Sequence, residues 1–334
     1  MPIVLLAALI TFSSTSLHAQ RPSSPADTTG EAVARQLAAV PLELYLADSN
    51  LHIINVYKVE AIILRESQGR SHEAIVDRLT REVYAPYAAF WHGYLGDEAA
   101  FRRWAATHLL ANDHPVHTRL AAWLNVRLDR LFAESSDWIV RTTARRPRDT
   151  WYIVFGPAWT DMGGFPDGTM LADFSQMLPD SSALALKLVH ELTHEVSGAG
   201  SVGRPDPDTG TVLSRIVSEG LACYATYVYG TARRLTPAQA LGYSESEWAW
   251  ALAHESDLIA AVKSRLVSRQ RADLNRVASR SERLLDPGPT AGGYWFGFRI
   301  VQAYVKEHGP ASWTDLLDLP VRDVLIRSGY PLRQ

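Results

Sequence analysis

The sequence predicts a mainly α fold that also contains a small antiparallel sheet. Apolar residues recur at three- and four-residue spacing over much of residues 31–143, most clearly over 118–140, which is the period of an amphipathic helix. Two short runs, 151–155 and 169–174, are the predicted strands, and "TDMGGFPDG" between them is predicted to be a loop. A composition that is 47% hydrophobic and 21% charged over 334 residues is typical of a globular protein with a large core.

The first twenty residues have the pattern of a secretory signal. They contain no Asp, Glu, Lys or Arg, and their apolar run from Ile3 to Phe12 is too short to span a bilayer. Cleavage after Ala19 would export the protein to the periplasm or the extracellular space, with no stable membrane insertion afterwards. Two features depart from the pattern, because no Lys or Arg precedes the apolar run and the bulky Leu17 stands three residues before the cut. The alternatives are an ordinary N-terminal helix and a retained anchor.

Composition also predicts how the rest of the chain is organised. After the signal peptide of residues 1–19, residues 20–30 are rich in Pro, Ser and Thr and predict a mobile lead-in. No linker divides residues 31–334, which are therefore predicted to form a single domain with a helical N-terminal half, 31–145, and a second half, 146–334, that carries the candidate site. The formal charge of −3 gives no reason to expect nucleic acid or an anionic membrane surface as a partner.

The stretch "KLVHELTHEVSG" holds two histidines four residues apart, with a glutamate directly after the first. Polar residues before it favour a helix start and Gly198 favours a stop, so the stretch is predicted to be a helix. On that helix His190, Glu191 and His194 point the same way.

This spacing suits a metal site. Zinc binds neutral imidazole nitrogens, and side chains at i and i+4 of a helix are close enough to hold one ion between them. A glutamate beside the first histidine lies next to the fourth coordination position, where it can take a proton from the metal-bound water. The alternative is an amphipathic helix whose solvated face bears Lys187, Glu191 and Glu195.

Glu219 is the candidate third ligand. It is the only acid or base of ordinary charge between Ile216 and Tyr229 in a mostly apolar predicted helix. A carboxylate in such a helix needs a counter-charge, which a metal ion would supply. The alternative is a surface ion pair with Arg215, four residues earlier, of a kind that is common and contributes little.

His190-Glu191-x-x-His194 followed by "SEGLA" at Glu219 resembles the gluzincin class of zinc metallopeptidases. It is also similar to bacterial zinc-dependent proteases that follow H-E-x-x-H and E-G-x-A with a late G-Y-x-x-G helix. The resemblance covers roughly the C-terminal half of the chain. It implies a zincin-like domain with one Zn²⁺ per chain on His190, His194 and Glu219, and with Glu191 as general base.

The chain departs from the family pattern at two places. The gap from His194 to Glu219 is longer than in the best-known aminopeptidase branch. Cys223 stands four residues after Glu219, where the thermolysin-like branch has an aspartate that orients a histidine, so the orienting partners stay unidentified. Cys223 is the only cysteine, which excludes an intramolecular disulfide, and its alternatives are a small buried core residue and a fourth ligand.

"AGGYWFGFRIVQAYV" predicts a late helix beside the site. Gly293 and Gly297, four residues apart, indicate close packing against a neighbouring helix or the metal centre. The resemblance implies that Tyr294 donates to the transition state. The alternative is an aromatic core residue beside Trp295 and Phe298.

A further implication comes from zincin folds, in which an edge strand upstream of the metal helix pairs with extended substrate. By this analogy the strand at 151–155 or at 169–174 would be that edge.

The function predicted from the sequence is an exported zinc metallopeptidase that acts on peptides or proteins through zinc-activated water, with Glu191 as general base and Tyr294 as donor. One alternative is a catalytically inactive binding protein on a zincin fold. The other is a zinc hydrolase of a non-peptide amide or ester.

Overall fold

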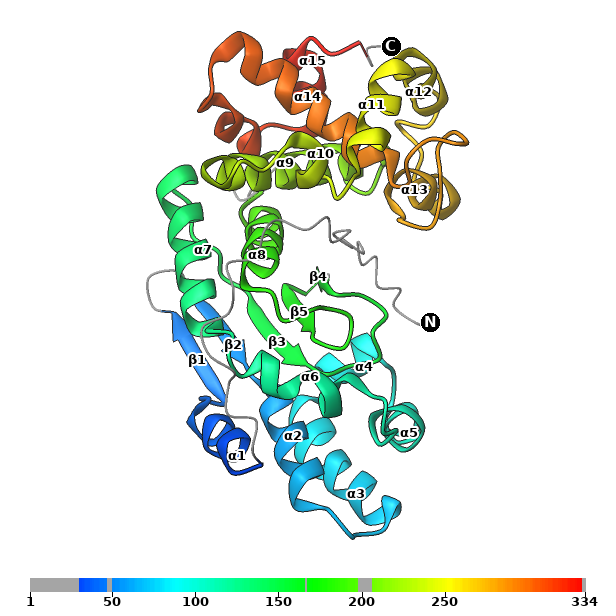
Figure 1. Ribbon diagram of the computed structural model, residues 1–334. Coiled ribbons are helices and arrows are strands. Elements are labelled where there is room, and N and C mark those ends of the chain that lie inside the picture. The colour runs from blue at the N-terminus through cyan, green and yellow to red at the C-terminus, as the bar shows by residue number, and fades with distance from the viewer. Residues whose placement is uncertain (1–29, 47–49, 166, 198–205, 332–334) are drawn as a thin grey trace. The chain divides into compact units, whose positions relative to one another are not determined.

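The computed structural model describes residues 30–46, 50–165, 167–197 and 206–331. The predicted signal peptide and the first ten residues of the predicted lead-in lie outside the described residues, and so does the predicted helix stop at Gly198. The fold is mainly α with one small sheet, which confirms the predicted fold class (Figure 1). Among the described residues, no helix combines the length and the apolar character needed to cross a bilayer.

The described chain divides into two compact units, which we describe separately. The first covers residues 30–133 and 148–184, and the second covers residues 134–147 and 185–331. The prediction of a single domain over residues 31–334 stays a prediction, because a division by contacts does not establish which part folds on its own.

The first unit is built on a sheet of five strands in the order β1-β2-β3-β5-β4. The strands are β1 (Glu43–Leu46), β2 (Leu51–Ile54), β3 (Thr150–Val154), β4 (Met162–Gly164) and β5 (Thr169–Asp173). The predicted antiparallel sheet is wrong, because β2 pairs with β3 and β3 with β5 in parallel, while only the two outer pairings are antiparallel. The physical reason is the long helical connection from β2 to β3, which provides the crossover that parallel strands require.

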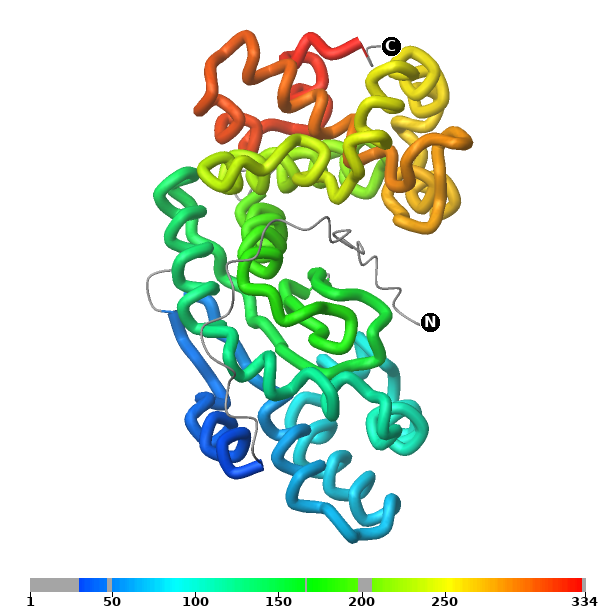
Figure 2. Tube along the Cα trace, viewed as in Figure 1, coloured from blue at the N-terminus to red at the C-terminus, as the bar shows by residue number. Residues whose placement is uncertain are grey.

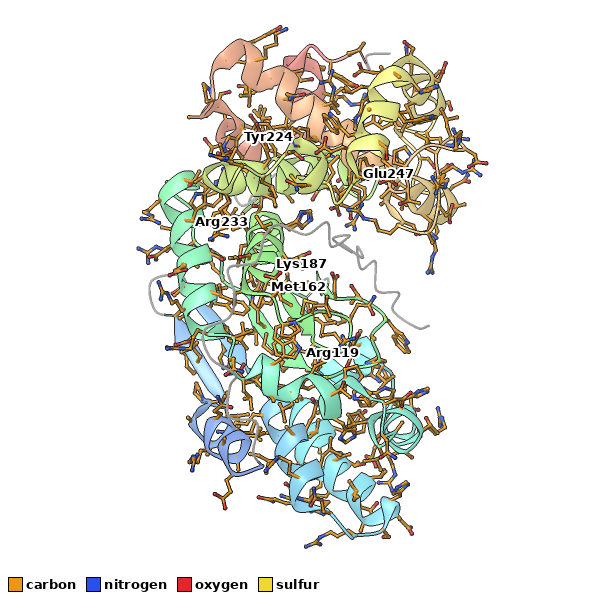
Figure 3. The ribbon with its side chains drawn as sticks, in the orientation of Figure 1. Arg119, Met162, Lys187, Tyr224, Arg233 and Glu247 are labelled. Atoms are coloured by element: carbon orange, nitrogen blue, oxygen red, sulfur yellow. The ribbon has the colours of Figure 1, made fainter. Side chains whose placement is uncertain are left out.

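Both predicted strands exist, as β3 and β5, but both are interior. The prediction that one of them is the edge strand is therefore wrong. The edge beside β5 is β4, which lies in the segment predicted to be a loop (Met162 is labelled in Figure 3). Glycine disfavours strands, so nothing local identified this segment; its pairing with β5, with Gly164 opposite Met170, makes it a strand.

The predicted helical N-terminal half is largely helical, but β1 and β2 interrupt it. Its α-helices are α1 (Gly30–Ala39), α2 (Val56–Glu66), α3 (His72–Leu79), α4 (Ala88–Tyr94), α5 (Glu98–Trp104), α6 (Pro115–Trp123) and α7 (Leu128–Thr143). The single helix predicted over 118–140 is wrong, because the chain breaks between Trp123 and Leu128. There the Asn125 side chain donates to the carbonyl oxygen of Ala121 at 2.9 Å, a local bond that competes with the helical ladder.

The second unit is helical, and Figure 2 follows its chain from green to red. Its α-helices after α8 (Ser181–Val196) are α9 (Val212–Gly230), α10 (Pro237–Ala240), α11 (Glu245–Ala253), α12 (Glu255–Lys263), α13 (Arg271–Ala278), α14 (Gly292–His308) and α15 (Val321–Ser328). The predicted close packing is confirmed, since a Cβ on Gly297 would lie 1.9 Å from the carbonyl oxygen of Ile216 on α9, and one on Gly293 would lie 2.7 Å from that of Val277.

Candidate metal centre

Helix α8 carries the two histidines. Asp180 caps its start by accepting from the backbone N–H groups of Ser182 at 2.8 Å and Ala183 at 3.2 Å. One helical turn separates His190 from His194, and their Nε2 atoms lie 3.1 Å apart. The pair therefore presents two ring nitrogens to the same point in space, as the sequence predicts.

Helix α9 brings Glu219 to that point. Thr211 caps the helix by accepting from the Ser214 backbone N–H at 3.2 Å. The Oε2 atom of Glu219 lies 3.2 Å from Nε2 of His190 and 3.6 Å from Nε2 of His194. One ligand atom from each of the three residues falls within 4.8 Å of the others. The structure thus brings together the three residues that the sequence predicts as ligands.

Burial decides against a solvated helix face. His190 is 1% exposed and Glu191 is 4% exposed, and Lys187, on the same helix (Figure 3), is 8% exposed. The alternative of a solvated face bearing Lys187, Glu191 and Glu195 is therefore wrong. Ionisable side chains are rarely buried in this way unless they have partners.

Arg215 pairs with Glu219, as the second alternative proposed, but not on the surface. Its Nη2 atom lies 2.9 Å from Oε1 of Glu219, whose side chain is only 1% exposed. The contact is an ion pair that does not meet the geometry of a hydrogen bond, since Oε1 has no hydrogen-bond partner among the described residues. One oxygen of Glu219 faces the histidines and the other faces the guanidinium, so the ion pair is present in buried form and the role of Glu219 as a metal ligand stays a prediction.

The electrostatics favour, at His190 and Glu219, the protonation states that a metal site needs. Burial lowers the pKa of His190 to about 4, so its imidazole is neutral at pH 7. Burial alone would raise the pKa of Glu219, but Arg215 and His194 hold it well below its usual range. Burial also works to lower the pKa of His194, but Glu219 outweighs it and raises that pKa, so a metal at His194 competes with a proton.

The chain is similar in sequence to a known protein family. Residues 155–326, more than half of the chain, match the family model described as "Predicted Zn-dependent protease (DUF2268)". The chain belongs to this family of predicted Zn-dependent proteases. The matched segment contains both histidines, Glu191 and Glu219. No curated protein and no solved structure matches the chain.

In this family member, the Nδ1 atoms of both histidines have contacts that the sequence did not predict. The Ser218 hydroxyl lies 3.0 Å from Nδ1 of His194, which leaves Nε2 of that ring facing Glu219. Behind His190, the Cys223 sulfur lies 4.0 Å from Nδ1. A donor or acceptor at the second ring nitrogen orients a ligating histidine. Ser218 directly precedes Glu219, and this adjacency is a sequence signal that could have identified it.

Cys223 is a buried free cysteine, 1% exposed. Burial raises the pKa of its thiol well above the usual range, and a metal ligand would have to be a thiolate. Its sulfur faces Nδ1 of His190, whereas Nε2 of that ring faces Glu219. The residue therefore fits a position behind the ligand and does not fit a fourth ligand.

Tyr294 lies on α14 against the site and is fully buried. Its ring is 6.3 Å from the His190 ring, centroid to centroid, and is tilted by 17°. The guanidinium carbon of Arg280, a residue that sequence reasoning missed, lies 4.6 Å from the centre of the Tyr294 ring. The Tyr294 hydroxyl has no hydrogen-bond partner among the described residues, so its role as a donor to substrate stays a prediction.

Proposed function

We propose that this protein is an exported zinc metallopeptidase of the gluzincin type. The observation that carries the proposal is the buried cluster of His190, His194 and Glu219, with Glu191 directly after the first histidine. The family's description as predicted Zn-dependent proteases supports a peptide or protein as the substrate. The apolar run at residues 3–12 supports export to the periplasm or the extracellular space.

The donor set fits one zinc ion per chain. Two imidazole nitrogens and one carboxylate oxygen are a common three-ligand set of hydrolytic zinc sites. The low pKa of Glu219 keeps the carboxylate charged, and the low pKa of His190 leaves its ring nitrogen free to bind. His190, His194 and Glu219 would hold the ion, and Ser218 and Cys223 lie behind the two rings.

The reaction is divided between the ion and the protein. Zinc, when bound, polarises the scissile carbonyl and lowers the pKa of a water molecule. Glu191 accepts the proton of the attacking water and delivers it to the leaving amine, so one carboxylate acts first as base and then as acid. Tyr294 donates to the negative charge that develops on the carbonyl oxygen. A purely structural metal site has no need of a base at Glu191, which favours a catalytic site.

The experiment measures zinc per chain in the purified protein and cleavage of a mixed peptide library. Glu191→Gln is expected to keep its zinc and to lose about a hundredfold or more of the cleavage rate. Glu307→Gln, an exposed carboxylate on α14, is the matched control and should cleave like the wild type. Wild-type protein without zinc would overturn the proposal. Zinc without any Glu191-dependent cleavage of peptides would favour the non-catalytic protein or the non-peptide hydrolase.

A further inference from the structure

The two oxygens of Glu219 have different partners. Oε2 lies 3.2 Å and 3.6 Å from the Nε2 atoms of His190 and His194, and Oε1 lies 2.9 Å from Nη2 of Arg215. The carboxylate is thus divided between a cluster of ring nitrogens and a permanent cation. The histidines lie on α8 and Arg215 lies on α9, the helix of Glu219 itself, and all of these residues belong to the second unit.

We propose that Arg215 is a positioning residue for the metal centre: it occupies one oxygen of Glu219, so that only the other oxygen is presented to the ion. This inference rests on the proposed metal function. Arginine cannot be deprotonated in proteins, so Arg215 keeps its charge at every working pH. A buried carboxylate that lacked this cation would be free to direct both oxygens toward the ion, because carboxylates bind metals through one oxygen or two.

The surroundings of Arg215 set it apart from an ordinary surface arginine. Its partner Glu219 is 1% exposed, whereas Glu66, the partner of Arg78, is 59% exposed and Asp129, the partner of Arg127, is 44% exposed. Arg215 Nε and Glu219 Oε1 are both buried atoms without a hydrogen-bond partner among the described residues. The pair therefore acts through charge and position rather than through a saturated hydrogen-bond network.

The number of Glu219 oxygens that face the ion decides how many coordination positions stay open at zinc. Two imidazoles and one carboxylate oxygen leave room at zinc for water and substrate, as hydrolytic sites require. A second carboxylate oxygen would compete for that room. Arg215 would in this way keep the site open without touching the substrate, which distinguishes a positioning residue from a catalytic one.

The test uses the protein loaded with Co²⁺, whose visible absorption is stronger at four-coordinate sites than at sites with more ligands. Arg215→Gln is expected to retain one cobalt per chain while its molar absorption falls roughly twofold, because Glu219 adds a second oxygen. Arg215→Lys, which restores the cation, should absorb like the wild type. Arg78→Gln is the matched control: it breaks another i,i+4 ion pair, and the Arg78 side chain is 24% exposed against 23% for Arg215.

The outcomes separate this inference from the proposed function. Wild-type protein that binds no cobalt or zinc overturns the proposed function. Wild-type protein that binds metal, combined with a folded Arg215→Gln variant that keeps the wild-type spectrum or binds no cobalt, overturns only the role of Arg215. Should the variant not fold, X-ray absorption of the wild-type zinc protein decides, since one carboxylate oxygen at the ion supports the inference and two overturn it.

Discussion

Gly220 of α9 lies directly against Gly297 of α14, where the two helices cross with no side chain between their backbones. A Cβ on Gly220 would lie 2.1 Å from the carbonyl carbon of Gly297. This crossing lies one residue from Glu219 on α9 and three residues from Tyr294 on α14, so it sets how closely the tyrosine approaches the candidate metal site.

Gly297→Ala is expected to lower the free energy of unfolding by about 3 kcal/mol, because the added methyl meets helix backbone that cannot rotate away. Urea unfolding measures this change. Gly292→Ala, on the same helix, is the control: its nearest neighbour is a side-chain carbon of Leu284 at 3.4 Å, an ordinary contact, so the change should stay within about 1 kcal/mol. Equal effects of the two substitutions would show that the crossing is not tight in solution.

Ser218→Ala is expected to weaken zinc binding about tenfold, because His194 loses the hydroxyl that lies 3.0 Å from its Nδ1 atom. Competition with a chromophoric chelator measures the dissociation constant. Ser264→Ala replaces an exposed serine at the end of α12 and should leave the constant unchanged. An unchanged zinc affinity in Ser218→Ala would contradict an orienting role for Ser218.

Metal removal is expected to destabilise the wild type. At free zinc about a thousand times the dissociation constant, binding adds about 4 kcal/mol to the free energy of unfolding, and a chelator removes this contribution. Glu219→Gln should lose most of the response to chelator, whereas Glu307→Gln should keep it. Thermal unfolding with and without chelator measures the difference. A chelator response in Glu219→Gln as large as in the wild type would remove Glu219 from the ligand set.

The raised pKa of Asp149, in the first unit, predicts that the free energy of unfolding depends on pH. Burial and then the charge of Asp167 raise the pKa of Asp149 to about 6, above the value of about 3.9 in an unfolded chain. Between these values the folded state binds more protons than the unfolded state. The stability that protonated Asp149 contributes is therefore fully present below about pH 4 and is lost as the pH rises through about 6.

Asp149→Asn should remove this loss. The variant is expected to gain about 1 kcal/mol in free energy of unfolding over the wild type at neutral pH, after allowance for solvent screening at a partly exposed group, and little below about pH 4. Unfolding in urea over this pH range measures the gain, with Asp113→Asn, at an exposed position, as the control. A gain that does not change with pH would show that titration of Asp149 is not its cause.

Much of the candidate site could be predicted because its information is local. The i,i+4 spacing places His190 and His194 on one helix face without any knowledge of the fold. Glu219 could be singled out because a lone carboxylate in an apolar helix needs a counter-charge. The contact of Arg280 with Tyr294 could not be predicted, because it depends on how the turn after α13 folds back onto α14. The contact of Cys223 with His190 could not be predicted either, because it comes from packing between α8 and α9.

The elements of the fold could likewise be predicted where their signal is local, and not where they depend on distant segments. Periodicity identified helices and the two interior strands, but β4 was missed because its glycines carry no strand signal. The parallel pairing of β2 with β3 was missed because a long helical connection separates them, and that of β3 with β5 was missed because β4 lies between them in the chain. A side-chain hydrogen bond at Asn125 broke a helix that periodicity alone would continue.

The sequence by itself determined which residues are candidate ligands, the spacing of the two histidines on α8 and the position of the candidate base Glu191, since a helix converts spacing directly into geometry. Only the tertiary structure decided that Glu219 meets both partners at once, with one oxygen toward the histidines and the other toward Arg215. The reason is physical: a helix period fixes neighbours within a segment, whereas the meeting of α8, α9 and α14 depends on which side chains are small enough to let the helices approach.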